Sequence, residues 1–224
     1  LLEEQLRELP VGKHLQDVWQ HMKCNIQGAW CGNAHTNPQG GGAVFKEALR
    51  RSWLKRQKEQ NANAPFSVTL VGHSAGAIHI CYLLQSIAAD PDGFEGLKFN
   101  IILLAPACDF RLMAQTLRKS ERFIGRVRIF GLNDSFERSD ALPAPHLRLY
   151  SGSLLYFVSG VLETNRFFRE QPESGTTTCP MAGDPDSADL CFDGADRPLV
   201  GLKRFYDTPR RPFYSVLYPD IEYV

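Results

Sequence analysis

The chain has 224 residues, of which 43% are hydrophobic and 22% are charged, with 25 Lys and Arg balancing 25 Asp and Glu. This length suits one domain, and the apolar fraction is that of a globular chain, not a disordered one. The balanced charge argues against the basic surface typical of nucleic-acid-binding or membrane-surface proteins. No run approaches the 18 apolar residues that a membrane span needs.

The first quarter of the chain predicts helices. Apolar residues at spacings of three and four predict one helix over residues 1–9 and a second over 13–27, separated by a break at Pro-Val-Gly, residues 10–12. A loop over residues 31–42 leads to a third helix, residues 43–60. The three glycines at the end of that loop follow no strand and precede no Gly-Lys-Ser/Thr, which argues against a phosphate-binding loop. The apolar face expected on the second helix is Leu15, Val18, Trp19, Met22 and Ile26.

Strands and helices alternate from residue 66 onwards. Short aliphatic and β-branched runs predict buried strands, and largely apolar or amphipathic stretches predict helices between them. The expected strands are residues 66–71, 99–105, 126–130 and 213–218, and the expected helices are residues 77–88, 110–118 and 153–163. This alternation is typical of βαβ units and predicts an α/β fold, a mostly parallel sheet flanked by helices on both faces.

Residues 170–196 differ in composition from the rest of the chain. They are rich in Gly, Pro, Ser, Thr and Asp, and they contain several acidic residues but no Lys or Arg. We expect either an acidic flexible insertion or a lid over the site. The Asp184-Pro185-Asp186 run resembles the start of a calcium loop, but position six is Asp189 where such a loop needs Gly, and no Glu closes it.

The six cysteines show no zinc-ligand spacing. Cys81 and Cys108 lie in apolar runs, where a free thiol acts as a small hydrophobic side chain. Cys179 and Cys191 flank a polar segment and can pair in an oxidising compartment. The expected location is therefore cytoplasmic, with secretion as the alternative if that pair forms.

One motif carries chemistry. Gly72-His73-Ser74-Ala75-Gly76 follows an apolar strand and precedes a helix, which is the context required of a Gly-x-Ser-x-Gly nucleophile elbow. Such a turn strains the serine backbone, and side chains at positions 72 and 76 are expected to collide with the strand and helix. The turn raises the Ser74 hydroxyl at a helix N-terminus, where the Ala75 N–H can donate to a developing oxyanion.

The run Val-Thr-Leu-Val-Gly-His-Ser-Ala-Gly resembles the nucleophile elbow of the α/β-hydrolase superfamily, which includes esterases and lipases. The strand ending Leu-Leu-Ala-Pro-Ala and the strand leading to Gly-Leu-Asn-Asp fit the order of that family. The resemblance covers residues 66–163. The Ser-Leu-Leu-Tyr run, Ser153–Tyr156, further resembles a little-characterised group of bacterial hydrolase-like proteins.

The resemblance implies a catalytic triad in the order Ser, acid, His. Asp134, just past the third strand, fits the acid, which would hold the imidazole tautomer and stabilise the imidazolium. Asp109, past the second strand, is the alternative. The base is open between His146, the one histidine after Asp134, and a histidine outside this chain.

The other histidines fit the base less well. Three precede the nucleophile: His14, His21 and His35. His73 adjoins Ser74 and cannot easily turn back to its hydroxyl. His79 follows on a mainly apolar helix, which favours a satisfied core histidine.

The sequence contains no convincing strand before residue 66 and no second oxyanion donor loop. We therefore expect the N-terminal strands of the family's sheet to be missing, and the chain, which starts at Leu1, to be a piece of a larger hydrolase.

The leading hypothesis is a serine hydrolase that cleaves a carboxylic ester or thioester through an acyl-enzyme on Ser74. The partner is then a small ester or acyl substrate, with no metal, cofactor or nucleic acid. A catalytically inactive binding or scaffold domain and an acyltransferase are the alternatives. The sequence leaves the oligomeric state open.

Overall fold

The computed structural model describes residues 2–30, 40–59, 66–132, 134–144, 147–163, 199–200 and 221–223. Several predictions lie outside them: His35, His146, the segment 170–196 with Cys179 and Cys191, and the strand at 213–218.

In chain order the elements are α1 (Leu2–Glu8), α2 (Pro10–Trp30), α3 (Gly41–Lys58), β1 (Val68–His73), α4 (Gly76–Ala89), β2 (Phe99–Leu104), α5 (Phe110–Ser120), η1 (Glu121–Phe123), β3 (Ile124–Phe130), α6 (Asp134–Ser139), β4 (Ala141–Ala144), β5 (Leu147–Ser151), α7 (Leu154–Phe157), η2 (Val158–Leu162) and β6 (Ile221–Tyr223).

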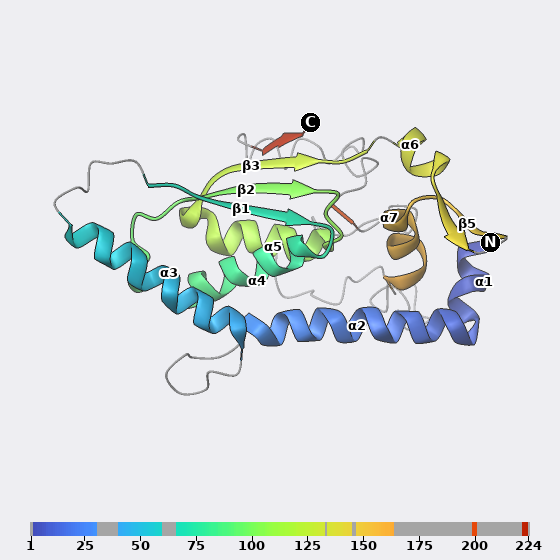
Figure 1. Ribbon diagram of the computed structural model, residues 1–224, viewed down its shortest axis with the longest axis horizontal. Helices are drawn as coiled ribbons and strands as arrows, with labels where there is room; N and C mark the ends of the chain where they lie inside the picture. Colours follow the sequence, from blue (N-terminus) through green and yellow to red (C-terminus); the bar gives the residue numbers. More distant parts are fainter. Residues whose placement is uncertain are drawn as a thin grey trace, which may run out of the picture.

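The main sheet is parallel, with strand order β1-β2-β3-β6 (Figure 1). Val68 pairs with Phe99, and Phe99 pairs with Ile124, so the three strands predicted between residues 66 and 130 lie side by side. A separate antiparallel pair joins β4 to β5. Helices flank the sheet, which confirms the predicted α/β arrangement.

One face of the sheet packs on helices and carries the core. Phe99, Ile101 and Leu103 alternate inward along β2 and are almost fully buried beside the α4 residues Ile78 and Leu84. The opposite face is open in part, because the outward residue Val71 is 61% exposed. The expectation that both faces are covered is therefore wrong for this face. The sequence carries a reason: Thr69, His73, Arg126 and Arg128 also point outward and favour water.

The first helix ends before Pro10, as predicted, but the second begins at Pro10 and not at residue 13. Proline is well accommodated at the first position of a helix, because an N–H at that position would have no intrahelical acceptor. The fixed φ of proline also suits the helix. The turn between α1 and α2 is tight, and a Cβ on Gly12 would lie 1.8 Å from the Leu6 carbonyl oxygen. Glycine therefore allows the two helices to meet at a corner there.

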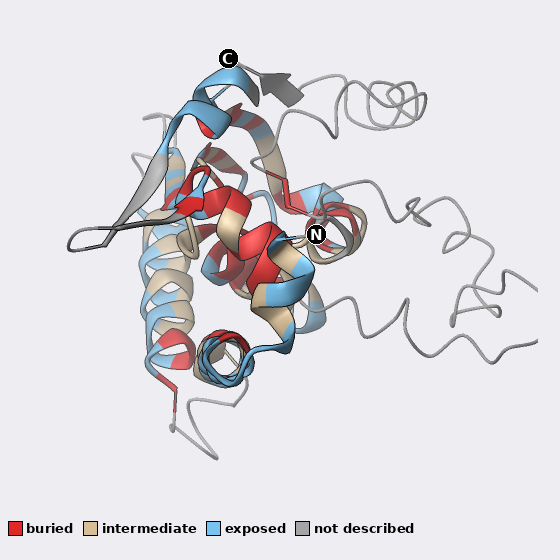
Figure 2. Ribbon diagram, turned by 90° about the vertical axis from the view of Figure 1, so that its right-hand side faces the viewer, coloured by how far each residue is buried: buried red, intermediate tan, exposed pale blue. Residues whose placement is uncertain are grey.

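The predicted helix at residues 153–163 is confirmed, but it changes character along its length. Ser153 caps α7 by accepting a hydrogen bond from the Tyr156 N–H at 3.2 Å, and the chain then widens into the π-helical turn η2. Most of this helix is buried (Figure 2).

A charged cluster joins the far end of η2 to α2. The Glu163 carboxylate, 7% exposed, accepts hydrogen bonds from Trp19 Nε1 at 2.8 Å and from Lys23 Nζ at 2.7 Å. The Gln16 amide also donates to the Val161 carbonyl at 3.0 Å. These contacts hold α2 beside η2, which lies beyond the carboxyl ends of the sheet strands (Figure 1).

The thiols of Cys81 and Cys108 behave as the sequence predicts. Both are free cysteines with no exposed surface, and they lie in the core. Hydrogen bonding to Cys81 and burial raise the pKa of the Cys108 thiol well above its ordinary value. A raised pKa leaves little thiolate, the reactive form, at neutral pH.

We therefore expect iodoacetamide at pH 8 to alkylate the exposed Cys24 quickly and to spare Cys81 and Cys108 until the protein is unfolded with urea. Peptide mass spectrometry after short labelling times measures each site separately. Rapid alkylation of Cys108 in the folded protein would contradict this packing.

Among the described helices, none combines the length and the hydropathy that a bilayer crossing requires.

Candidate active site

Ser74 occupies the tight turn between β1 and α4. Its backbone φ is 51°, in the left-handed region that non-glycine residues rarely adopt. Hydrogen bonds hold it there: the Ser74 N–H donates to the Leu104 carbonyl at 3.0 Å, and the Ser74 carbonyl accepts from the Ala107 N–H at 3.1 Å. The strand, turn and helix therefore form the strained geometry predicted from the Gly-x-Ser-x-Gly motif.

A second strained residue, missed from the sequence, lies at the end of the neighbouring strand. Ala105 has φ 43°, and its N–H donates to the Phe130 carbonyl at 2.8 Å. Each of these two adjacent strands is thus followed directly by a residue in the left-handed conformation. Such conformations cost about 1–3 kcal/mol each and persist where the surroundings hold them. The Ala-Pro pair after a buried strand was the available signal, since it marks an abrupt end to the strand.

The two motif glycines serve different purposes. A Cβ at Gly72 would lie 2.8 Å from Ile80 Cδ1 and 2.9 Å from the Gly76 carbonyl carbon, so only glycine allows α4 to pack against the end of β1. A Cβ at Gly76 would meet nothing within 4 Å. The predicted collision is therefore confirmed at position 72 and wrong at position 76, because the space that a Cβ on Gly76 would enter is open.

The start of α4 presents free donors beside the serine. Within the described residues, the N–H groups of Ala75 and Gly76 donate no hydrogen bond, and the half-buried Ser74 hydroxyl has no partner. The first N–H groups of a helix lack intrahelical acceptors and carry the positive end of its dipole. The turn can therefore stabilise negative charge close to the Ser74 hydroxyl.

The two candidate acids differ in position. Asp134 is the first residue of α6, just beyond β3, and its side chain lies outside the described part of the chain. Asp109 has a structural task, because its Oδ1 accepts a hydrogen bond from the Leu112 N–H at 3.4 Å at the start of α5. The Asp109 backbone also forms an isolated antiparallel β-bridge with Leu199.

The described histidines do not supply a base in hydrogen-bond contact with Ser74. His73 is exposed at the end of β1. His79 is exposed as well, so the expectation of a core histidine is wrong; its Nδ1 accepts from Trp30 Nε1 at 3.2 Å. That bond makes Nε2 the protonated nitrogen of the neutral ring. His14 and His21 are exposed on α2.

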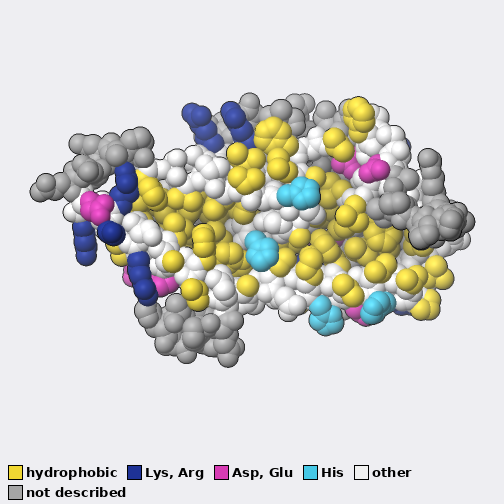
Figure 3. Space-filling view, viewed as in Figure 1, with side chains coloured by type: hydrophobic (Ala, Val, Ile, Leu, Met, Phe, Trp, Pro, Cys, Tyr) yellow, Lys and Arg dark blue, Asp and Glu magenta, His cyan; other side chains and the backbone are white. Residues whose placement is uncertain are grey.

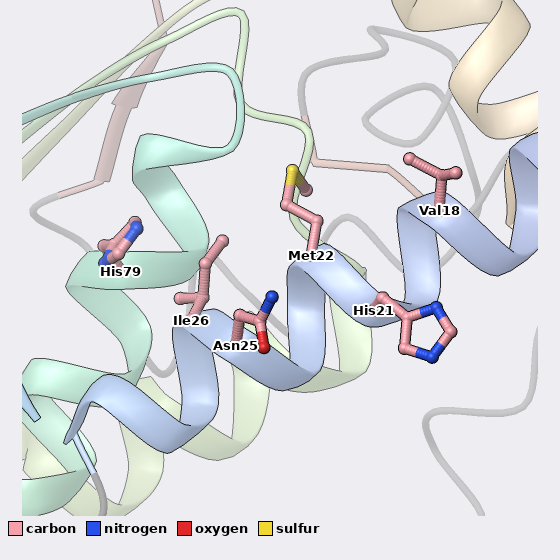
Figure 4. Close-up of a pocket in the computed structure, with 6 residues that line it drawn as sticks. All are labelled: Val18, His21, Met22, Asn25, Ile26 and His79. Carbon is pink, nitrogen blue, oxygen red and sulfur yellow. The ribbon is translucent and has the colours of Figure 1, made fainter. Parts of the chain in front are cut away.

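A groove of about 500 Å³ runs between α2 and α4 (Figure 4). Its lining residues are Val18, His21, Met22, Asn25, Ile26 and His79. Met22 and Val18 rise from α2 on the side of the turn before α4, whereas His21 points away (Figure 4). The sequence showed the apolar spacing of α2 but not the groove, because periodicity does not reveal what lies opposite a helix face.

No cluster of His, Cys, Asp and Glu suited to a metal ion occurs among the described side chains. Comparisons with protein-family models, curated proteins and solved structures find no match to this chain.

Proposed function

We propose that the chain carries the nucleophile of a serine hydrolase and that Ser74 attacks the carbonyl carbon of a carboxylic ester or thioester. The single observation that carries the proposal is the left-handed Ser74 between a parallel strand and a helix, with φ 51° and a hydroxyl that bonds to none of the described residues. Strain of this kind is retained where it serves a function. The proposal includes an α/β-hydrolase type of sheet, with Ser74 after β1 and Asp134 after β3.

The reaction has two stages. The Ser74 oxygen bonds to the carbonyl carbon as its proton passes to an imidazole, and the oxyanion accepts hydrogen bonds from the N–H groups of Ala75 and Gly76. The leaving alcohol or thiol departs with that proton. Water then cleaves the acyl-enzyme by the same steps, and the acid is released. His146 is the base in this proposal, and Asp134 orients it.

A fluorophosphonate probe tests the nucleophile directly, because it reacts with activated serines without requiring knowledge of the natural substrate. We expect it to label the wild-type chain and not Ser74→Ala, with peptide mass spectrometry placing the adduct on Ser74. Asp134→Asn should lower the labelling rate by about 10³–10⁴-fold if this acid orients the base. Ser159→Ala, which removes a buried hydroxyl distant in sequence, is the control and should label as the wild type does.

Absence of labelling in folded protein would overturn the hydrolase proposal and favour the inactive binding domain. Labelling of Ser74 without hydrolysis of p-nitrophenyl acetate would instead favour transfer of the acyl group to an acceptor other than water.

A further inference from the structure

The groove between α2 and α4 has a definite position relative to Ser74. Trp30, the last residue of α2, bonds to His79 in the first turn of α4. Trp19 and Lys23, earlier on α2, bond to Glu163 after η2. The part of α2 between these two anchors therefore passes the N-terminal end of α4, which begins two residues after Ser74.

An apolar stripe of α2 lines the groove. Val18, Met22 and Ile26 recur every four residues and form one stripe of α2, about 12 Å long at 1.5 Å per residue. Met22 and Ile26 also pack against the core, which fixes the floor, while Val18 is 52% exposed. In Figure 4 this stripe faces the α4 side of the groove.

The described part of the lining carries no formal charge: its polar members are His21, Asn25 and His79, and it includes no Asp, Glu, Lys or Arg. In Figure 3 hydrophobic side chains gather across the middle of this face beside histidines, and charged side chains lie mainly toward its margins. An uncharged, largely apolar ligand suits such a lining, since a buried charge would find no partner there.

We propose that this groove binds the acyl chain of the ester attacked by Ser74, and that the substrates are medium-chain acyl esters. This inference rests on the proposed function. The ester carbonyl lies at the turn before α4, and the chain extends along Val18, Met22 and Ile26. The Nε2–H of His79 remains available to a polar group of the ligand, because Nδ1 is held by Trp30.

The test compares p-nitrophenyl acetate, butyrate and octanoate in the wild type and in two matched variants. Val18→Trp narrows the groove, whereas Val11→Trp places the same side chain on the same helix at a residue of similar exposure, 59%, outside the groove. We expect wild-type kcat/KM to rise about tenfold or more from acetate to octanoate. In Val18→Trp the octanoate value should fall about tenfold and the acetate value should stay within about twofold.

Val11→Trp should match the wild type on all three esters. Asn25→Trp, at an exposed position on another side of the groove, should repeat the effect of Val18→Trp and guards against a folding defect in one variant.

A preference for octanoate that survives both groove variants would overturn the inference, as would equal rates for all chain lengths. A change in the oligomeric state of the groove variants at unchanged selectivity would show that another protein surface occupies the groove. Fluorophosphonate labelling of Ser74 in the same samples separates these outcomes from failure of the hydrolase proposal, which would abolish labelling in the wild type as well.

Discussion

Glu163→Ala is expected to lower the free energy of unfolding by about 3–5 kcal/mol, the cost of removing one partner of a buried ion pair. The carboxylate is 7% exposed and receives both the Trp19 indole N–H and the Lys23 ammonium, which themselves are 144 and 140 residues away in the chain. Without it the indole N–H stays buried with no acceptor. Lys23, at 22% exposure, can turn partly toward water, which places the expected loss nearer the lower figure.

The control is an exposed pair of the same chemistry. Lys55 and Glu59 lie 3.8 Å apart at the end of α3, with side chains 79% and 53% exposed, so Glu59→Ala should change stability by no more than about 0.5 kcal/mol. Urea unfolding followed by circular dichroism measures both variants. Equal stability of Glu163→Ala and Glu59→Ala would show that the cluster does not hold α2 against η2. Glu163→Gln, which keeps an acceptor for Trp19, should fall between the wild type and Glu163→Ala.

Gly72→Ala is expected to damage the turn that holds Ser74. Its Cβ would approach the Gly76 carbonyl carbon at 2.9 Å and the Ala77 nitrogen at 3.0 Å, and backbone atoms cannot move aside as the Ile80 methyl can. We expect α4 to shift at its first turn, with a loss of about 1–3 kcal/mol in stability. The same shift should displace Ser74 from the N–H groups of Ala75 and Gly76 and slow fluorophosphonate labelling by about tenfold or more.

Gly76→Ala is the matched comparison within the same motif. Its Cβ meets open space, and its backbone φ is not positive, so the substitution should leave labelling unchanged and alter stability by no more than about 1 kcal/mol, in the stabilising direction. Thermal unfolding and labelling rate are measured together. If Gly72→Ala labels as fast as Gly76→Ala, the close contact between β1 and α4 does not control the position of Ser74.

Local sequence patterns were sufficient for the elements around Ser74. The β-branched and aliphatic runs at β1, β2 and β3 favour extended structure on their own, so each strand was predicted to within about two residues, the usual uncertainty of an element boundary. The predicted burial of β1 is wrong, because β1 lies at the edge of the sheet and only its Gly72 is buried. The motif likewise predicts its own geometry, because a serine in a tight turn between strand and helix is forced into a left-handed conformation, and the φ of Ser74 is 51°. Pro10 shows where local signals mislead: the same residue can end one helix or begin another.

Asp134 lies beyond β3 as predicted, but its side chain and the whole of His146 fall outside the described part of the chain. The assignment of both remains a prediction from the resemblance.

The sequence by itself determined the α/β alternation, the strained serine and the burial of Cys81 and Cys108, since each depends on residues close together in the chain. Only the tertiary structure decided which glycine is indispensable, where Glu163 finds its partners, and how α2 passes the start of α4 to form the groove. These features depend on contacts between segments many residues apart, and hydrophobic periodicity records that a helix face is apolar without recording what lies opposite it.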